Sequence, residues 1–421
     1  MVTSTEIRAK SVLLTDEEKL RAAVEVIVNS TPVTDVHTHL FPPEFNELCL
    51  FGIDELLTYH YLTAETFRSA RISPDRFWQM SKTDQADLVW QTLFVENSPT
   101  SEAARGVISV LDAFGLDTRA ADLKEARAFF VSRNIAEHVE QVFDIARVSG
   151  VVMTNDPFDE TEDRFWKSGI HVDQRFKSSL RLDRLLNNAK TDANATNLRG
   201  LLDESIQRLN SVYLAVSLPA DFKFPSDDLR ERLLREVVLP TAKEHKLPLT
   251  LMIGVRRRIN PALREAGDGL GRADVTAVER LCAGYSDVKF LVTFLSRENQ
   301  HELCVAARKF NNLMPFGCWW FLNNPSIVSE ITRERFELLG QSFIPQHSDA
   351  RVLEQLIYKW KHSRQQIANA LFASYQQLLN SGRAVTTEEI SRDVNRMFSG
   401  NFHEWIGAEN ESLEKEPSHW T

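Results

Sequence analysis

The spacing of hydrophobic residues divides the chain into two kinds of region. From about 44 to 148, apolar residues recur every three or four positions, which is the spacing of one face of an α-helix. From 149 onward, short apolar runs without polar alternation take over. Such runs are typical of strands that are buried on both faces of a parallel sheet. The pattern therefore predicts a long helical region followed by an α/β region.

Eight apolar runs are candidates for the strands of that sheet. They read VTDVHTH, GVVMTND, KSSLRLD, VYLAVSL, PLTLMIG, VKFLVTFL, LMPFGCWW and SFIPQHSD, with helical or loop-like stretches between them. Eight strands separated by helices favour a (β/α)8 TIM barrel, in which functional residues lie at the carboxyl ends of the strands. Polar residues, among them Arg181, Arg256 and Arg297, do end nearly every run. A doubly wound open sheet is the alternative fold, but it gives no reason for this arrangement.

The same pattern predicts four segments along the chain. The first contains a helix over 11–30, for which Thr15 and Glu18 have the spacing of a capping box. The segments are an N-terminal helix with barrel strand 1 (1–43), a helical insertion (44–148), barrel strands 2–8 (149–351) and C-terminal helices packing outside the barrel (352–421). The polar run at 187–197 and the glycine-containing GDGLGR at 267–272 are expected to be loops.

Composition narrows the classes of function. A hydrophobic content of 43% with 26% charged residues is that of a globular protein, and the formal charge of −10 offers no basic surface for nucleic acid. No window approaches ~18 apolar residues, so no membrane span is expected. Four cysteines without C-x-x-C spacing indicate a reducing compartment, and we expect a cytoplasmic protein. With nucleic acid and membranes excluded, we expect the binding partner to be a small molecule. A homo-oligomer is compatible with the sequence.

The stretch VTDVHTHLF at 33–41 carries the strongest chemical signal. Side chains two positions apart on a strand project the same way, so His37 and His39 are predicted to lie side by side and to hold one divalent ion. Asp35 precedes them on that face and is placed to orient a ligand from behind. Taken alone, the motif is also compatible with two core histidines that are bound by backbone groups.

The eighth run supplies a third ligand candidate. In a closed barrel the first and eighth strands are neighbours, so Asp349 is expected to face His37 and His39. Two histidines and one carboxylate, with a position left open, describe a catalytic metal site rather than a structural one. Arg351 would project the same way as Asp349 if the strand continues.

These residues carry a resemblance to a known family. H-x-H at the end of strand 1 with Asp at the end of strand 8 resembles the metal signature of the amidohydrolase superfamily, and the chain is more narrowly similar to uronate (glucuronate) isomerases. The similarity spans nearly the whole chain in order. The matching stretches are DVHTHLFPP, LLTYHYL at 56–62, SLRLD at 179–183, LMIGVRRR at 251–258, FLVTFLSRENQHEL at 290–303, GCWWFLNN at 317–324 and IPQHSDAR at 344–351.

The resemblance implies the interconversion of D-glucuronate with D-fructuronate and of D-galacturonate with D-tagaturonate. A proton moves between C2 and C1 through an enediol, assisted by one divalent metal ion, for which we expect zinc. Asp349 is the candidate for both metal ligand and proton carrier, and Arg351 would stabilise the oxyanion. The resemblance also assigns His60 and Tyr61 to the site, from the helical insertion, as catalytic and substrate-binding residues. The alternative to a role in the site is that the helix simply buries the rings of His60 and Tyr61.

Further residues are candidates for contacts with the substrate. Arg181 could pair with the uronate carboxylate, and a salt bridge with Asp183 or Asp156 is the competing account. Of the two adjacent tryptophans, Trp320 is expected to face the sugar while Trp319 packs against helices. Many relatives carry a histidine where this chain has Met252, so Met252 is expected to line the pocket without binding metal. Seven histidines are expected to be surface or packed residues, namely His138, His171, His245, His301, His362, His403 and His419.

Two other functions are compatible with the sequence. The first is a metal-dependent hydrolase of the same superfamily that acts on an ester or amide. It would be favoured by histidines ending strands 5 and 6 or a lysine ending strand 4, and these are absent from the sequence. The second is a sugar-acid binding protein with a structural metal, which gives no role to an aspartate beside an arginine on strand 8.

Overall fold

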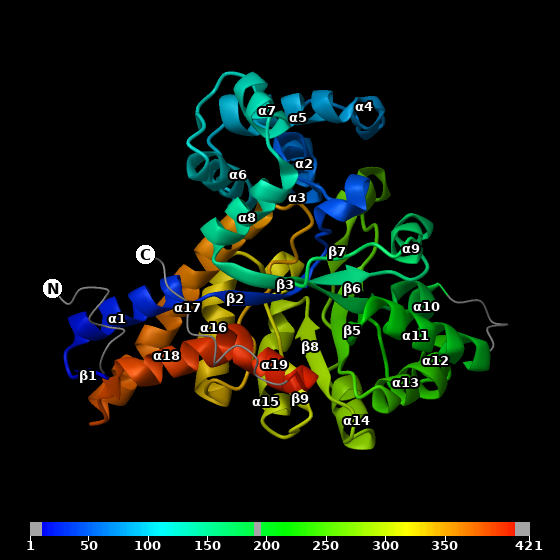
Figure 1. Ribbon diagram of the computed structural model, residues 1–421, viewed down its shortest axis with the longest axis vertical. Coiled ribbons are helices and arrows are strands. Elements are labelled where there is room, and N and C mark those ends of the chain that lie inside the picture. Colours follow the sequence, from blue (N-terminus) through cyan, green and yellow to red (C-terminus); the bar gives the residue numbers. More distant parts are fainter. Residues whose placement is uncertain (1–10, 189–194, 409–421) are drawn as a thin grey trace.

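A curled parallel sheet forms the centre of the computed structural model, which describes residues 11–188 and 195–408 (Figure 1). Seven strands pair in the order β2-β3-β4-β5-β6-β8-β9, each parallel to its neighbour. They are β2 (Val33–Thr38), β3 (Val148–Asn155), β4 (Phe176–Arg181), β5 (Ser211–Pro219), β6 (Leu249–Arg256), β8 (Phe290–Phe294) and β9 (Leu313–Pro315). The mixed α/β class and seven of the eight predicted strands are thus confirmed.

The eighth predicted strand is only partly formed. The segment 344–350 makes a single parallel bridge to the sheet, between Phe316 and Ile344. Its other end bonds to the opposite outer strand, because the Asp349 N–H donates to the His37 carbonyl (3.1 Å) and the His39 N–H donates to the Ala350 carbonyl (2.7 Å). Asp349 has a positive φ of 53°, which interrupts extended backbone. The segment therefore lies between β9 and β2 without being a regular strand.

Two short strands lie outside the parallel path. β7 (Gly269–Leu270) pairs antiparallel with β6, so the prediction of a loop over 267–272 is wrong at this point. β1 (Leu13–Leu14) pairs with β10 (Val385–Thr386) and joins the two ends of the described chain. Of the predicted loop at 187–197, residues 189–194 lie outside the described residues, whereas Asn187 ends one helix and 195–197 begin the next, so the prediction is wrong at these positions.

The helices expected from the 44–148 pattern form a layer at one end of the molecule (Figure 1). Ser73, Ser81, Ser101 and Asn134 each cap a helix by accepting a backbone N–H of its first turn. The helices are α2 (Ile53–Thr58), α3 (His60–Ser69), α4 (Pro74–Gln79), α5 (Lys82–Trp90), α6 (Glu102–Ala113), α7 (Lys124–Val131) and α8 (Ile135–Ala146).

Helices between the strands cover the outer face of the sheet. Most of their apolar faces pack on β4, β5, β6 and β8 in one continuous cluster of buried side chains, which does not include the buried residues of the last helix. They are α9 (Glu160–Lys167), α10 (Asp183–Asn187), α11 (Ala195–Leu209), α12 (Leu229–Leu233), α13 (Leu239–Glu244), α14 (Thr276–Gly284), α15 (Gln300–Ala307) and α16 (Pro325–Leu339). None of the described helices is long and apolar enough to cross a membrane.

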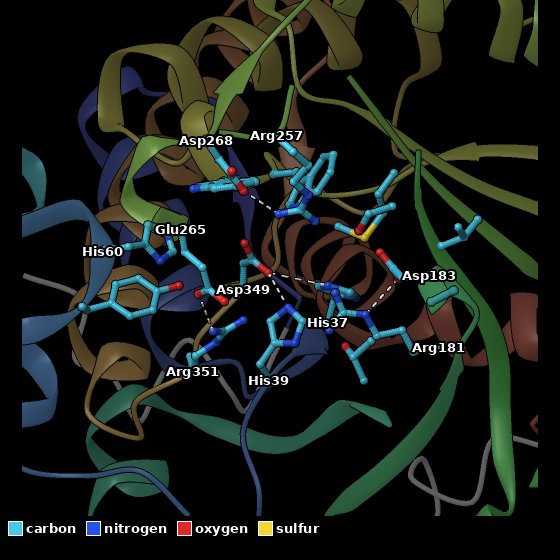
Figure 2. A pocket seen from close by; sticks show the side chains of 18 residues that line it. His37, His39, His60, Arg181, Asp183, Arg257, Glu265, Asp268, Asp349 and Arg351 are labelled. Atoms are coloured by element: carbon cyan, nitrogen blue, oxygen red, sulfur yellow. Dashed lines mark hydrogen bonds and ion pairs between the residues drawn. The ribbon is translucent and has the colours of Figure 1, made fainter. Parts of the chain in front are cut away.

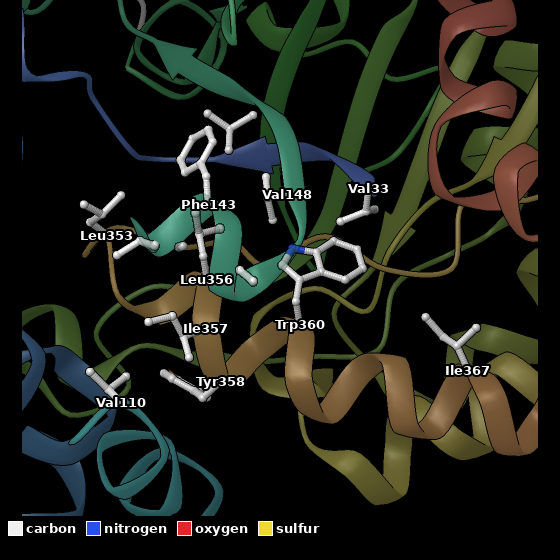
Figure 3. Close-up of a cluster of buried hydrophobic side chains, with 14 of the residues drawn as sticks. Val33, Val110, Phe143, Val148, Leu353, Leu356, Ile357, Tyr358, Trp360 and Ile367 are labelled. Atoms are coloured by element: carbon white, nitrogen blue, oxygen red, sulfur yellow. The ribbon is translucent and has the colours of Figure 1, made fainter. Parts of the chain in front are cut away.

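The long helix α17 (Gln355–Asn380) connects the sheet region with the helical layer. It packs against α1 (Glu17–Ser30), α16, α6 and α8, and Figure 3 shows part of the apolar cluster around it. Gly106 permits the close approach of α6, since a Cβ there would lie 2.7 Å from the Tyr358 ring. The predicted helical tail is completed by α18 (Thr387–Asn395) and α19 (Asn401–Ile406). The predicted Thr15 cap of the first helix is wrong, because Asp16 caps α1 by accepting from the Lys19 N–H.

Candidate metal centre and active site

A cavity of about 270 Å³ opens at the carboxyl ends of the central strands, with ten of its residues labelled in Figure 2. This is the end of the sheet where the sequence predicted the functional residues. The strands β2 to β6 and the helical layer contribute side chains to it. The chain segments that follow β6 and β9, and the segment 349–351, contribute the others. The lining residues are His37, His39, Tyr59, His60, Thr154, Arg181, Asp183, Ala215, Val216, Ser217, Met252, Arg257, Glu265, Asp268, Trp319, Trp320, Asp349 and Arg351.

His37, His39 and Asp349 meet on the floor of this cavity. The Asp349 Oδ1 lies 3.6 Å from the His37 Nε2 and 3.4 Å from the His39 Nε2 (Figure 2). The three ligand atoms lie within 4.8 Å of one another, and no other histidine, cysteine, aspartate or glutamate of the described residues joins them. The predicted cluster is therefore assembled by the fold, and its three donor atoms lie close enough together to hold a metal ion.

The environment keeps both imidazoles neutral. Burial lowers the pKa of His37 to about 3, and burial likewise lowers the pKa of His39 well below its usual range. The Tyr213 hydroxyl donates to the Val36 carbonyl (2.7 Å) and lies 3.4 Å from the His37 Nδ1. Since that hydroxyl can then accept from Nδ1–H, the lone pair of His37 remains on Nε2, toward Asp349.

Asp349 is held by its backbone rather than through its carboxylate. Asp35, fully buried, accepts the Ser348 N–H (3.1 Å) and the Trp360 indole N–H (2.8 Å). Asp35 thus orients the segment that carries the third ligand and contacts neither histidine ring by a hydrogen bond. Burial raises the pKa of Asp349, against the lowering effect of the neighbouring His37 and of nearby lysine and arginine side chains, and its Oδ1 has no hydrogen-bond partner among the described residues. A residue with a positive φ at such a place is a common sign of a functional constraint.

Three arginines surround the cavity, and each is paired with a carboxylate. The Arg181 Nε donates to Asp183 (2.9 Å), Arg257 donates to Asp268 (2.6 Å) and Arg351 donates to Glu265 (3.3 Å) (Figure 2). The alternative prediction for Arg181, a salt bridge with Asp183, is therefore confirmed. Arg181 nevertheless lines the cavity, so it can also contact a substrate there. Arg351 lines the cavity too, although the backbone does not continue as a strand from Asp349, which was the condition for the predicted direction of Arg351.

The helical layer brings His60 to the cavity through the start of α3. Its ring lies 5.5 Å from that of Trp320, centroid to centroid, and its Nε2 is buried without a hydrogen-bond partner among the described residues. Tyr61 packs against His60 with ring centroids 4.4 Å apart, but it does not line the cavity, whereas Tyr59 does. Trp320 lies at the cavity as predicted. Trp319 lines it as well, so the expected alternation of the two rings is wrong.

Several cavity residues carry no sequence signal that singles them out. Arg256 was the predicted strand-end arginine, but its neighbour Arg257 reaches the cavity, because the chain turns after β6. Arg297 is engaged by Glu330 at 2.9 Å, outside the cavity. Tyr213 supports His37 from the middle of β5, where only a structure can pair it with β2.

Met252 lines the cavity, as predicted. The remaining histidines of the described chain lie outside the metal cluster. His301 pairs with Glu334 on the surface, His245 pairs with Asp203, and His138 is buried against Glu354 at 2.7 Å. His419 lies outside the described residues.

Known structures resemble this one over nearly the whole chain. A uronate isomerase from Bacillus halodurans C-125 is 50% identical, with 94% of this chain and 98% of that chain covered and a TM-score of 0.92. A uronate isomerase from Thermotoga maritima (14% identity, 94% and 100% covered, TM-score 0.71) and a glucuronate isomerase from Caulobacter crescentus (14%, 96% and 95%, 0.72) share the fold. So does a putative metal-dependent hydrolase from Lactobacillus casei (15%, 91% and 97%, 0.56).

The sequence itself matches fewer known proteins than the structure does. No family model matches the chain, and no curated protein matches it either. The structural relative from Bacillus halodurans, however, shares half of its residues with this chain over almost the full length of both. At that identity and coverage, the fold and the family are shown together. The chain belongs to the uronate isomerase family.

Proposed function

We propose that this chain interconverts D-glucuronate with D-fructuronate and D-galacturonate with D-tagaturonate. The observation that carries the proposal is one cavity that combines a His-His-Asp metal cluster with three arginines, in a chain 50% identical to a uronate isomerase. A proton leaves C2 to a base while O1 gains one, which gives the enediol. A proton then returns at C1 while O2 loses its own, so the product is an isomer and no redox partner is consumed.

A divalent metal ion fits the floor of the cavity. The cluster offers two neutral imidazole nitrogens and one buried carboxylate oxygen that has no hydrogen-bond partner among the described residues. His37, His39 and Asp349 would hold the ion, which we propose to be a single zinc. When bound, it would bring the substrate's oxygens together and disperse negative charge that develops on them.

The remaining roles follow from where each side chain lies. Asp349, whose pKa is raised by burial, is the proposed proton carrier. Arg351 would stabilise the enediolate, and Arg181 would bind the uronate carboxylate through its terminal amino groups while Asp183 holds its Nε. Trp320 would pack against the sugar. His60 and Tyr61 are proposed to complete the site from the helical layer.

We also propose a complete barrel, the boundaries of its segments, a cellular location and an oligomeric state. The 344–350 segment bonds to β9 at one end and to β2 at the other, which supports a (β/α)8 barrel closed by an irregular eighth strand. The segment boundaries at 43, 148 and 351 follow the change from barrel to helical layer and back. The four cysteines are all buried and unpaired, which supports a reducing, cytoplasmic location. A homo-oligomer stays a proposal.

A proton NMR assay in deuterium oxide tests the activity. The purified chain should convert D-glucuronate and D-galacturonate to their ketoses without an added nucleotide, with deuterium exchange at the transferred position. A hydrolase of the same superfamily would leave both sugar acids unchanged. Elemental analysis of the metal-reconstituted protein should give about one zinc per chain, as a three-ligand open site implies. Two ions per chain would contradict the proposed ligand set.

A further inference from the structure

A buried lysine lies behind the cavity on α17. Lys359 is 1% exposed and is among the largest fully buried side chains of the protein. Among the described residues, its Nζ has no hydrogen-bond partner. An ammonium that is removed from water without a partner destabilises the folded state. A residue kept under those conditions needs a reason other than the stability of the fold.

Two tyrosine rings enclose this ammonium. The Nζ lies 5.3 Å from the ring centroid of Tyr61, on α3, and 5.6 Å from that of Tyr358, on α17 itself. Both distances are within the range of cation–π interaction, which is stronger in a desolvated place. The Tyr61 hydroxyl is also buried and without a hydrogen-bond partner among the described residues. Opposing charges that act on the lysine come from Glu102 and from Asp349, since burial raises the pKa of each carboxyl against the lowering effect of Lys359.

Packing alone does not require a charge at this position. The flanking residues Tyr358 and Trp360 belong to the large apolar cluster around α17, and Figure 3 shows them directed toward different neighbours. Tyr358 faces the helical layer near Val110, and Trp360 faces the strands near Val33 and Val148. An unbranched apolar side chain would fill the space of the lysine stem among such neighbours.

A line of contacts connects Lys359 with the cavity. Lys359 contacts the Tyr61 ring, Tyr61 packs edge-on against His60 at 4.4 Å, and His60 lines the cavity beside Trp320 at 5.5 Å. The pKa of His60 is lowered by burial first, and then by the positive charges of Arg351 and Lys359. The lysine is therefore close enough to influence the site although it does not line the cavity.

We propose that Lys359 is a positioning residue, which holds the Tyr61 ring, and through it His60, against the cavity during turnover. This inference rests on the proposed isomerase function. Because Lys359 does not line the cavity, its loss should act on the turnover rate more than on substrate binding. Because its ammonium is buried and unpaired, its loss should not weaken the fold.

The test is Lys359→Met, assayed with D-glucuronate by NMR and unfolded thermally in parallel. We expect kcat to fall roughly 10- to 100-fold, the scale of a misplaced active-site group, with KM changed less than about twofold. Metal content should be unchanged and Tm should be equal or higher. The matched control is Tyr358→Phe, which alters the other ring beside Lys359 and should keep wild-type turnover.

A double-mutant cycle identifies the route of the effect. In a Tyr61→Leu background, Lys359→Met should lower kcat by less than about twofold, since residues that act through one another are not additive. Full additivity would overturn the role assigned to Tyr61, and a lower Tm for Lys359→Met would show that the lysine serves the fold. An active wild type with an equally active Lys359→Met would overturn the inference. A wild type inactive on both uronates would instead contradict the proposed function.

Discussion

The floor and the rim of the cavity are built on opposite principles. On the floor, His37, His39 and Asp349 are largely buried, and the Asp349 Oδ1 has no hydrogen-bond partner among the described residues. At the rim, the guanidinium groups of Arg181, Arg257 and Arg351 are more exposed and each is engaged by a carboxylate. The floor concentrates electron-pair donors, whereas the rim holds cations whose charge is already compensated.

This difference indicates how each part would bind its ligand. Donors fixed by the β2 backbone and by the bonded 348–350 segment are preorganised for one ion, so loss of a donor removes an interaction that nothing replaces. At the rim, the charge of each arginine is already partly compensated by a protein carboxylate, which Arg181 would keep and Arg351 would exchange for a substrate oxygen, so each arginine contributes less to affinity than an unpaired charge would. Substitutions on the floor should therefore have larger effects than substitutions at the rim.

The largest effect is expected for Asp349→Asn. The amide can neither carry the proton nor bind a metal ion as a carboxylate does, so turnover should fall at least ~100-fold. Steady-state kinetics with D-glucuronate, together with metal analysis, would measure both consequences. Asp156→Asn is the control, because Asp156 pairs with Arg184 at 3.0 Å outside the cavity, and this variant should stay active. Near-normal turnover in Asp349→Asn would show that the proton carrier is another residue.

The floor could be predicted from the sequence because its signal is local. His37 and His39 share one strand, and the alternation of a strand fixes their relative placement. The position of Asp349 opposite the two histidines was predicted from one topological assumption, that the first and last strands are neighbours. The assumption holds in the hydrogen bonds between His37, His39 and the 349–350 backbone, even though that backbone is not a regular strand. Helical and strand periodicity likewise located most elements, with errors at a cap and at the short strand β7.

The rim could not be predicted in the same way, because its residues come from turns and from pairs far apart in sequence. The cavity is lined by Arg257 and not by the predicted Arg256. The path of the chain where it turns after β6 decides which of the two faces inward, and hydrophobic periodicity does not determine that path. Glu265 and Arg351 are separated by 86 positions and meet only because the 261–267 segment folds over the cavity. Lys359 reads as an ordinary polar position of a surface helix until the helical layer is placed on α17.

A smaller effect is expected for Arg181→Met, which tests the rim as a binding surface. Loss of a charge-assisted bond to the substrate, roughly 1.5–3 kcal/mol, should lower kcat/KM by about 10- to 100-fold, mainly through KM. Metal content should be unchanged, because Arg181 contacts the substrate side and not the ligands. Arg184→Met is the matched control, since Arg184 pairs with Asp156 and Asp159 outside the main cavity. Loss of metal or of folded protein in Arg181→Met would show that the arginine is structural.

The smallest effect, and the sharpest test of exchange at the rim, is expected for Glu265→Gln. The Arg351–Glu265 pair is the most exposed of the three, with side-chain exposures of 36% and 74%. Pairs of this kind contribute roughly 0.2–1 kcal/mol, so freeing Arg351 should lower KM for uronates by at most about fivefold and leave kcat nearly unchanged. The gain should shrink as salt screens the charges. Glu55→Gln, which changes a carboxylate paired with Lys82 in the adjoining hollow, should leave KM as it is. A higher KM in Glu265→Gln would mean that Glu265 assists binding, for instance by holding the 261–267 segment in place, and the contrast between a fixed floor and an exchanging rim would then fail at Arg351.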